Sequence, residues 1–371
     1  MKPDDLQLTA QSRVLFLAPH PDDESLAGGA LLQRAAAAGA AVRVLFATNG
    51  DNNPWPQRFV DRRWSVGSNE RKRWGARRRQ EARDALCVLG LSEGAGEFLG
   101  FPDQGFSSAL LRADTKVLDT FTNEIRDWQP TLLVLPSPHD IHPDHNALAV
   151  IFDIALRRLP VNLRPRVLHF PVHPYGTNAD GADITLHLTD TEVRRKRRAI
   201  LCHETQMALS QRRFLRYATT EEYFLSDAWS RAEAVRHPIR EVALINGALR
   251  VRLHARWRVA APRLLIAAGS VLDESARWEV PLLQKSGTVR MSECVTERPL
   301  RLATIRKHED MLEVRIPLAP LQPLAYLFVK LERRLAFYDH AGWVRVPLAV
   351  NDLATSVDET TDLQVSTLSN K

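Results

Sequence analysis

Short apolar runs alternate with longer segments of helical periodicity through the first two-thirds of the chain. Apolar runs of about four to eight residues bounded by turn residues predict buried strands, and apolar positions three and four apart predict amphipathic helices. Strands alternating with helices in this way predict a Rossmann-like α/β fold, with a mostly parallel sheet and flanking helices. The predicted strands are residues 13–18, 41–48, 131–135 and 166–172, and the predicted helices are residues 23–38, 77–89, 110–128, 146–158 and 191–209.

The pattern changes after about Asp227, where short β-like runs are separated by turns or charged stretches. No long helical pattern intervenes, which is typical of an antiparallel, β-rich unit such as a sandwich. We therefore expect two domains: an α/β domain at residues 1–227 and a β-rich, sandwich-like domain at residues 228–371 that ends in a polar tail. The predicted strands of the second domain lie within residues 241–255, 263–268, 278–283, 311–318 and 343–349.

The balance of charge leaves several classes of partner open. The 371 residues carry a formal net charge of +6, much of it in two clusters, Arg71–Arg79 and Arg194–Arg198. Such clusters suit nucleic acid, anionic lipid or phosphorylated sugars, and they are equally compatible with solvated helix faces. Because no helix-turn-helix, zinc-finger or aromatic RNA-binding signature accompanies them, we expect no nucleic-acid partner.

Cysteine usage and hydropathy predict a cytoplasmic protein. The three cysteines are far apart and form no Cys-x-x-Cys pair, so a disulfide framework is not expected. No stretch reaches the ~18 consecutive apolar residues of a membrane span, and the N-terminus lacks the pattern of a secretory signal. We expect no transmembrane segment, and peripheral contact with the inner face of a membrane is compatible with the sequence. The oligomeric state is not predicted.

Two polar motifs follow predicted strands, where the sites of parallel sheets form. The run His-Pro-Asp-Asp-Glu follows the first strand at residues 20–24, and a loop rich in His and Asp follows the third at residues 137–145. Zinc catalysis needs about three His or carboxylate ligands and an open position. His20 and Asp23, with His145 from the second loop, make such a set, which also suits Fe²⁺ or Co²⁺. Each motif alone could equally supply helix caps and loop hydrogen bonds.

Both motifs resemble the signatures of a known family. The stretch LAPHPDDESLAGGALL is similar to the opening signature of the PIG-L, or LmbE-like, family of zinc-dependent N-acetylglucosaminyl deacetylases, and the His-Pro-Asp-His run at residues 142–145 is similar to its second signature. The resemblance covers about residues 12–225. Further similar stretches are residues 48–51, 78–90, 98–103 and 203–206, the last with Thr205 in place of a serine.

The resemblance implies a reaction and a set of roles. The activity it implies is removal of the N-acetyl group from an N-acetylglucosamine-type glycoconjugate, releasing a free amine and acetate. It implies zinc ligands at His20, Asp23 and His145, a general base at Asp22, and an oxyanion-stabilising group at His142. Arg78 and Asp103 match positions that contact sugar hydroxyls in relatives. Because histidine ligands usually donate to a nearby acceptor, we expect Glu24 and Asp144 to orient the ligands.

Other functions were weighed against this one. A dinucleotide enzyme is excluded because no G-x-G-x-x-G follows the first strand, and Gly28-Gly29 falls inside a helix. Another metal-dependent hydrolase, such as a phosphoesterase, and a nucleic-acid-binding protein acting through the basic clusters remain as alternatives. The acceptor that carries the sugar is not identified. Since arginine suits phosphate, we expect a large, phosphorylated or lipid-linked substrate that the β-rich unit helps to hold.

Overall fold

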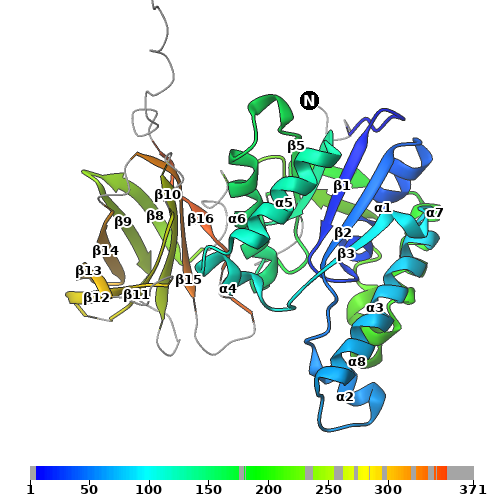
Figure 1. The fold of residues 1–371 in the computed structure, drawn as a ribbon, viewed down its shortest axis with the longest axis horizontal. Helices are drawn as coiled ribbons and strands as arrows, with labels where there is room; N and C mark the ends of the chain where they lie inside the picture. Colours follow the sequence, from blue (N-terminus) through cyan, green and yellow to red (C-terminus); the bar gives the residue numbers. More distant parts are fainter. Residues whose placement is uncertain are drawn as a thin grey trace, which may run out of the picture.

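A five-stranded parallel sheet of order β3-β2-β1-β4-β5 forms the centre of the N-terminal unit (Figure 1). Its neighbouring strands all run parallel, as the alternation of strands and helices predicts. The computed structural model describes residues 6–174, 179, 181–229, 237–254, 262–270, 275–283, 285–294, 299–318, 323–332, 338–339 and 341–348. The strands of the sheet are β1 (Arg13–Ala18), β2 (Ala41–Thr48), β3 (Gly96–Phe101), β4 (Leu132–Pro136) and β5 (Arg166–Phe170).

Helices cover both faces of this sheet, because side chains of a strand alternate between its faces. In β1, Val14 and Phe16 pack into a core with α1, α3 and α7, whereas Leu15 and Leu17 pack into another with α4, α5 and α6. The helices are α1 (Asp23–Ala37), α2 (Pro54–Asp61), α3 (Ser68–Leu89), α4 (Phe106–Leu111), α5 (Thr115–Trp128), α6 (Pro143–Arg157), α7 (Asp190–Cys202) and α8 (Glu204–Leu215), with short 3₁₀ turns η1 (Glu93–Ala95) and η2 (Val161–Leu163).

Two of the predicted helices are each divided in two, for local reasons, and the helix predicted at 77–89 begins earlier, at Ser68. The helix expected at 110–128 is divided into α4 and α5, because Asp114 accepts hydrogen bonds from the backbone N–H groups of Lys116 and Val117 and so begins a new helix. The helix expected at 191–209 is divided at His203, whose backbone is not helical. The sequence analysis did not predict strand β3 or helix α2.

The C-terminal unit is a single nine-stranded sheet in which all neighbouring strands are antiparallel. Strands from both ends of this sheet share one apolar core, to which Ile239 and Val344 belong, so the sheet curves around its own interior. Only the antiparallel, β-rich character was therefore predicted correctly, and the paired sheets of a sandwich are replaced by one curved sheet. The order is β16-β15-β10-β11-β12-β13-β14-β9-β8, formed by β8 (Ile239–Ile245), β9 (Ala248–His254), β10 (Arg263–Ser270), β11 (Ser275–Pro281), β12 (Gly287–Glu293), β13 (Pro299–His308), β14 (Met311–Pro317), β15 (Leu324–Glu332) and β16 (Val344–Arg345).

The two units share an apolar core. Helices α4, α5 and α6 lie between the parallel sheet and strands β10 and β15 (Figure 1). Leu265 and Ala267 of β10 and Phe328 of β15 are buried in the same cluster as the residues of α5 and α6. Trp229 joins this cluster and contacts the Phe328 ring at 5.1 Å between centroids. The predicted boundary at residue 227 therefore precedes a segment that is itself part of the shared core, and the tail from Val357 lies outside the described residues.

Polar contacts also join the units. Lys330 of β15 is fully buried and forms an ion pair with Asp339, whose Oδ2 also accepts a hydrogen bond of 2.8 Å from Asn146 Nδ2 in α6. A small antiparallel pair, β6 (Ile184–His187) with β7 (Glu221–Phe224), completes the N-terminal unit. In the part of the chain that is described, no helix combines the length and apolar character needed to cross a bilayer.

Gly342 permits a close approach between the backbones of the two units. A Cβ atom at this position would lie 1.7 Å from the carbonyl oxygen of Pro138. The neighbouring Trp343 N–H donates to the same oxygen at 3.0 Å, so the two backbones are held in contact here.

We predict that Gly342→Ala lowers the free energy of unfolding by about 1–3 kcal/mol, because the added methyl group overpacks a backbone contact. Denaturant unfolding monitored by tryptophan fluorescence measures this change. Gly287→Ala in β12 is the matched control, since its Cβ would have 3.9 Å to the nearest atom. Equal stability of the two variants would contradict the prediction.

Candidate metal centre

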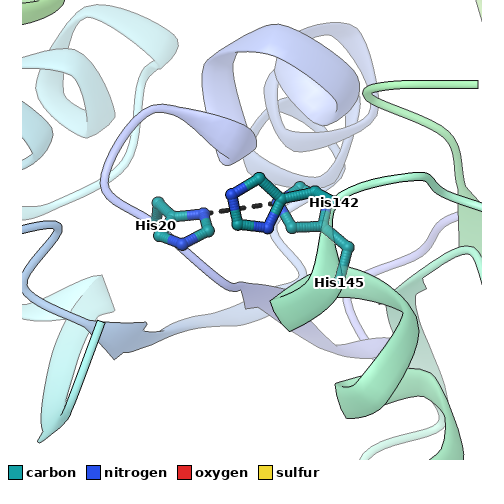
Figure 2. A group of neighbouring side chains, drawn as sticks. All are labelled: His20, His142 and His145. Carbon is teal, nitrogen blue, oxygen red and sulfur yellow. Dashed lines mark hydrogen bonds between the residues drawn. The ribbon is translucent and has the colours of Figure 1, made fainter. Parts of the chain in front are cut away.

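Two loops at the carboxyl edge of the parallel sheet bring His20, Asp23 and His145 together. His20 follows β1, Asp23 begins α1, and His145 lies in the first turn of α6 after β4. His145 Nε2 lies 3.3 Å from both His20 Nδ1 and Asp23 Oδ2, and these two atoms are 3.4 Å apart. Figure 2 shows the rings of His20 and His145 approaching from the two loops.

This triangle fits a tetrahedral metal ion. Zinc bonds to His nitrogen and carboxylate oxygen are about 2.0–2.2 Å long, so ligand atoms at the corners of a tetrahedron lie roughly 3.3–3.6 Å apart. The three observed separations fall in this range, and the three side chains are buried. The residues that the sequence predicts as ligands thus form a set that suits zinc, with a fourth position left for water or substrate.

Asp140 fixes which nitrogen of His145 faces the triangle. Its Oδ2 lies 3.1 Å from His145 Nδ1 and also accepts backbone N–H bonds from Val172 and His173, each at 3.0 Å. Burial by itself raises the pKa of the Asp140 carboxyl, but the neighbouring His145 and the donated hydrogen bonds outweigh it and lower the pKa to about 2. Because a carboxylate only accepts, His145 carries its proton on Nδ1 and presents the lone pair of Nε2 to the triangle.

His142 has the opposite tautomer. Its Nδ1 accepts the backbone N–H of Asp144 at 3.2 Å, as the N-cap of α6, so the ring proton lies on Nε2. Burial lowers the pKa of His142 well below its usual range, and the ring is therefore a neutral N–H donor. The ring lies 4.7 Å from that of His20 and 4.8 Å from that of His145, measured between centroids (Figure 2). His142 could complete a three-histidine set with them, but its tautomer favours a donor beside the metal site.

Asp22 and Arg78 form a buried pair beside the triangle. Arg78 Nη2 lies 3.1 Å from Asp22 Oδ2 and donates to the carbonyl of Pro21, while Nη1 donates to the carbonyl of Gly50. Burial raises the pKa of the Asp22 carboxyl to about 6, although the Arg78 guanidinium acts in the opposite direction. Gly50 has a φ of +60°, and a Cβ there would lie 1.8 Å from Arg78 Nη1, so this contact requires glycine.

The second ring nitrogen of His20 faces two further carboxylates. His20 Nε2 lies 3.2 Å from Asp103 Oδ1 and 3.4 Å from Asp144 Oδ2. Asp144 thus contacts a predicted ligand, as expected, and Asp103 contacts the same ring in addition to lining the cavity. The expectation for Glu24 is different from what the structure shows: its Oε1 accepts hydrogen bonds from His203 and Ser25, behind the site.

Of the residues described above, His20, Asp22, Asp23, Arg78, Asp103 and His142 line a cavity of about 290 Å³. A larger cavity of about 720 Å³ lies between α4–α6 and the β-rich unit. Its described lining holds no His and a single carboxylate, Asp114, so the smaller cavity is the better candidate site. The smaller cavity is lined by His20, Asp22, Asp23, Leu26, Asn53, Trp55, Pro56, Arg78, Asp103, Gln104, His142, His173, Gln206, Leu209, Ser210, Arg213, Phe214, Tyr217 and Tyr338.

Sequence reasoning missed several residues of this site. Asp140 stands in the second motif, but its spacing from His145 gave no specific role. His173 and Tyr217 lie in segments without a motif, and the Tyr217 hydroxyl donates to the carbonyl of Val172 at 2.9 Å. Tyr338 comes from the β-rich unit, and no sequence signal connects it to the metal motifs.

The comparisons with known proteins agree with the two motifs. The profile of the family described as "PIG-L: GlcNAc-PI de-N-acetylase" matches residues 15–156. A 1D-myo-inositol 2-acetamido-2-deoxy-alpha-D-glucopyranoside deacetylase of Mycobacterium leprae is 32% identical over 149 residues, covering 36% of this chain and 46% of that protein. The deacetylase of the same description from Thermomonospora curvata is 30% identical over 146 residues, covering 36% and 48%. The chain thus spans about half the length of the curated relatives it matches.

Solved structures align with a little more than half of the chain. The N,N'-diacetylchitobiose deacetylase of Pyrococcus horikoshii aligns with a TM-score of 0.45 and 20% identity, covering 57% of this chain and 82% of that one. A deacetylase of the teicoplanin biosynthetic pathway aligns with a TM-score of 0.45 and 23% identity, covering 57% and 96%. Both signature motifs lie inside residues 15–156, so this segment of the N-terminal unit is similar to the PIG-L family.

Proposed function

We propose that this protein is a metal-dependent N-deacetylase that hydrolyses the N-acetyl group of an N-acetylglucosamine-type glycoconjugate. The observation that carries the proposal is the triangle of His20 Nδ1, Asp23 Oδ2 and His145 Nε2, whose sides of 3.3–3.4 Å suit zinc. The curated relatives that match residues of this unit are named as deacetylases of an acetamido sugar, which supports the same reaction class.

The residues around the triangle would each have a separate role in amide hydrolysis. Zinc at this position would act as a Lewis acid on water and on the acyl carbonyl, bringing the pKa of water toward ~7. Asp22 would take the proton of the attacking water and deliver it to the leaving amine, for which a pKa of about 6 is well placed. His142 would donate its Nε2–H to the oxyanion of the tetrahedral intermediate.

The two predicted sugar-binding residues, Arg78 and Asp103, also contact other residues of the site. Arg78 uses two guanidinium nitrogens on Gly50, Pro21 and Asp22, so we infer that it positions the base as well as lining the cavity. Asp103 uses Oδ2 for the N–H of Asn52, which leaves Oδ1 between the His20 ring and the cavity. The exposed Trp55 at the rim offers an apolar face on which a sugar ring can stack.

A phosphoesterase is less well supported. Such enzymes often hold a second metal ion, for which Asp103 and Asp144 are the nearest carboxylates. Both oxygens of Asp144 already accept backbone N–H bonds, from Gln104 at 2.7 Å and Phe106 at 3.1 Å. We therefore expect acetate release from an acetamido sugar and no comparable turnover of a phosphoester.

We predict that the purified protein holds about one zinc, Fe²⁺ or Co²⁺ ion per chain and that His145→Ala loses it. Asp140→Asn should weaken metal affinity by about 10- to 100-fold, because the ring of His145 loses the carboxylate that sets its tautomer. Elemental analysis and competition with a chelator measure both effects. His187→Ala, at an exposed histidine, is the control. A metal-free wild-type protein with full hydrolase activity would disprove the metal site.

We predict that Asp22→Asn retains the metal and the fold but loses about 10²- to 10⁴-fold in kcat, because an amide cannot accept the proton of the attacking water. Acetate release from an N-acetylglucosaminide measures the rate. Asp84→Asn on the exposed face of α3 is the matched control. A wild-type rate for Asp22→Asn would remove Asp22 from the role of base.

We predict that His142→Ala also retains the metal and lowers kcat by about 10²- to 10³-fold, since it removes one oxyanion donor. The same assay, paired with elemental analysis, distinguishes a donor from a ligand. Loss of the metal together with the activity would instead assign His142 to the ligand set.

A further inference from the structure

Three exposed aromatic side chains gather on α2 and on the loop that follows it. Trp55, Phe59 and Trp64 are 63%, 61% and 84% exposed, and the part of the chain that is described holds no other tryptophan or phenylalanine of comparable exposure. Trp55 and Phe59 are four positions apart, so they share one face of α2. Pro56 and Gln57 are buried, and α2 packs against α8. The helix is therefore held to the protein by one side and presents aromatic rings to solvent on another.

Arg58 connects the loop to the helix. Its guanidinium carbon lies 5.0 Å from the centre of the Trp55 ring and 5.7 Å from that of the Trp64 ring, so the cation contacts both aromatic side chains. Its Nε is buried and has no hydrogen-bond partner among the described residues. The three side chains thus form one surface in which a positive charge lies between apolar rings.

The surroundings of these rings are basic. Residues 55–74 hold six Lys or Arg and two Asp or Glu. Of the two acidic residues, Glu70 pairs with Arg63 and Arg73, and Asp61 accepts a hydrogen bond from Gln57. The other basic side chains at the surface of this segment are Arg62, Arg71 and Lys72. The excess of positive charge around exposed aromatic rings suits an anionic partner with an apolar interior.

This aromatic surface begins at the rim of the metal cavity. Trp55 and Pro56 line that cavity, together with the exposed Leu209 of α8. Phe59 and Trp64 do not belong to its described lining, so they extend the apolar surface outward from the rim. In Figure 1, α2 and the loop after it project at the lower end of the N-terminal unit. The aromatic rings therefore lie on a projecting end of the molecule.

We propose that α2 and the loop after it, residues 54–67, dock onto an anionic lipid bilayer. Tryptophan and phenylalanine enter the boundary between headgroups and acyl chains, where arginine keeps its charge among the headgroup phosphates. Anionic lipids supply the negative charge that offsets the basic excess of residues 55–74. A bilayer also adapts to a projecting end of a protein, whereas a folded partner would need a pocket matched to the rings. With α2 docked, the mouth of the metal cavity lies close to the lipid surface.

The test measures co-flotation of the full chain with vesicles of phosphatidylcholine alone, or of phosphatidylcholine and phosphatidylglycerol in about equal amounts. We expect binding to the anionic vesicles to be stronger by about 10-fold or more, and to weaken as salt screens the charges. Phe59→Ala combined with Trp64→Ala should lower this binding by about 10-fold or more, because the apolar contact with lipid is lost. Arg62→Gln should lower it by about 3- to 10-fold.

Val161 and Arg166 provide the matched controls. Both side chains are exposed, and they lie in η2 and at the start of β5, at the amino edge of the parallel sheet. Val161→Ala and Arg166→Gln should therefore bind vesicles as the wild-type protein does. Because all the altered side chains are exposed and lie outside the described cavity lining, every variant should keep the wild-type circular dichroism and metal content.

Failure of the wild-type protein to bind anionic vesicles would overturn the proposal. Equal binding by the double aromatic variant and Val161→Ala, or by Arg62→Gln and Arg166→Gln, would do the same. Sedimentation velocity without vesicles tests the other occupant: a wild-type dimer that the double variant cannot form would assign this surface to a second copy of the chain and reject the bilayer. None of these measurements uses hydrolysis, so failure of the proposed deacetylase function would leave their result unchanged.

Discussion

The pairing of β1 with β4 is the constraint on which the candidate site depends. The strand order β3-β2-β1-β4-β5 places the chain's first strand between its second and its fourth, so the direction of winding reverses between β1 and β4. Loops that leave a parallel sheet at such a reversal diverge to opposite faces and open a crevice between them. His20 follows one of these strands and His145 the other, and their nitrogens meet at 3.3 Å although the sequence separates them widely. A different strand order would leave both motifs intact and bring no ligands together.

Within that crevice, hydrogen bonds decide the chemistry of residues that are identical in type. His142 and His145 stand in the same turn but make opposite hydrogen bonds. Nδ1 of His145 donates to Asp140, whereas Nδ1 of His142 accepts from the backbone N–H of Asp144. One ring therefore offers a lone pair and the other offers a proton. Asp140 itself is an ion in a buried place, which is tolerable only because backbone and ring N–H groups surround it. The hydrogen bonds of this loop thus distinguish the proposed metal ligand, His145, from the proposed oxyanion donor, His142.

The sequence predicted the parallel sheet, the two motifs and their meeting at one edge, because hydrophobic period and strand-end position are local signals. It predicted less well the features of the structure that depend on contacts between residues far apart in the sequence. Asp114 and His203 interrupt predicted helices through capping and backbone geometry that periodicity does not record. Asp103 faces the His20 ring because β3 pairs beside β2, and β3 was not predicted. The position of Tyr338 could not be predicted from the sequence, because it follows from the packing of the β-rich unit against α6.

That packing makes the β-rich unit part of the candidate site, since its residues reach the cavity and the loop beside it. Lys330 of β15 is fully buried, and a buried ammonium is stable only with its counter-ion, so Asp339 must stay beside Lys330. The same carboxylate accepts from Asn146, which follows the proposed ligand His145 and also donates to the carbonyl of Asp140. The ion pair at the unit boundary and the loop that shapes the metal triangle are therefore parts of one hydrogen-bonded network. A chain that lost the β-rich unit would lose one wall of the cavity and, with it, the outer support of the residue that orients His145.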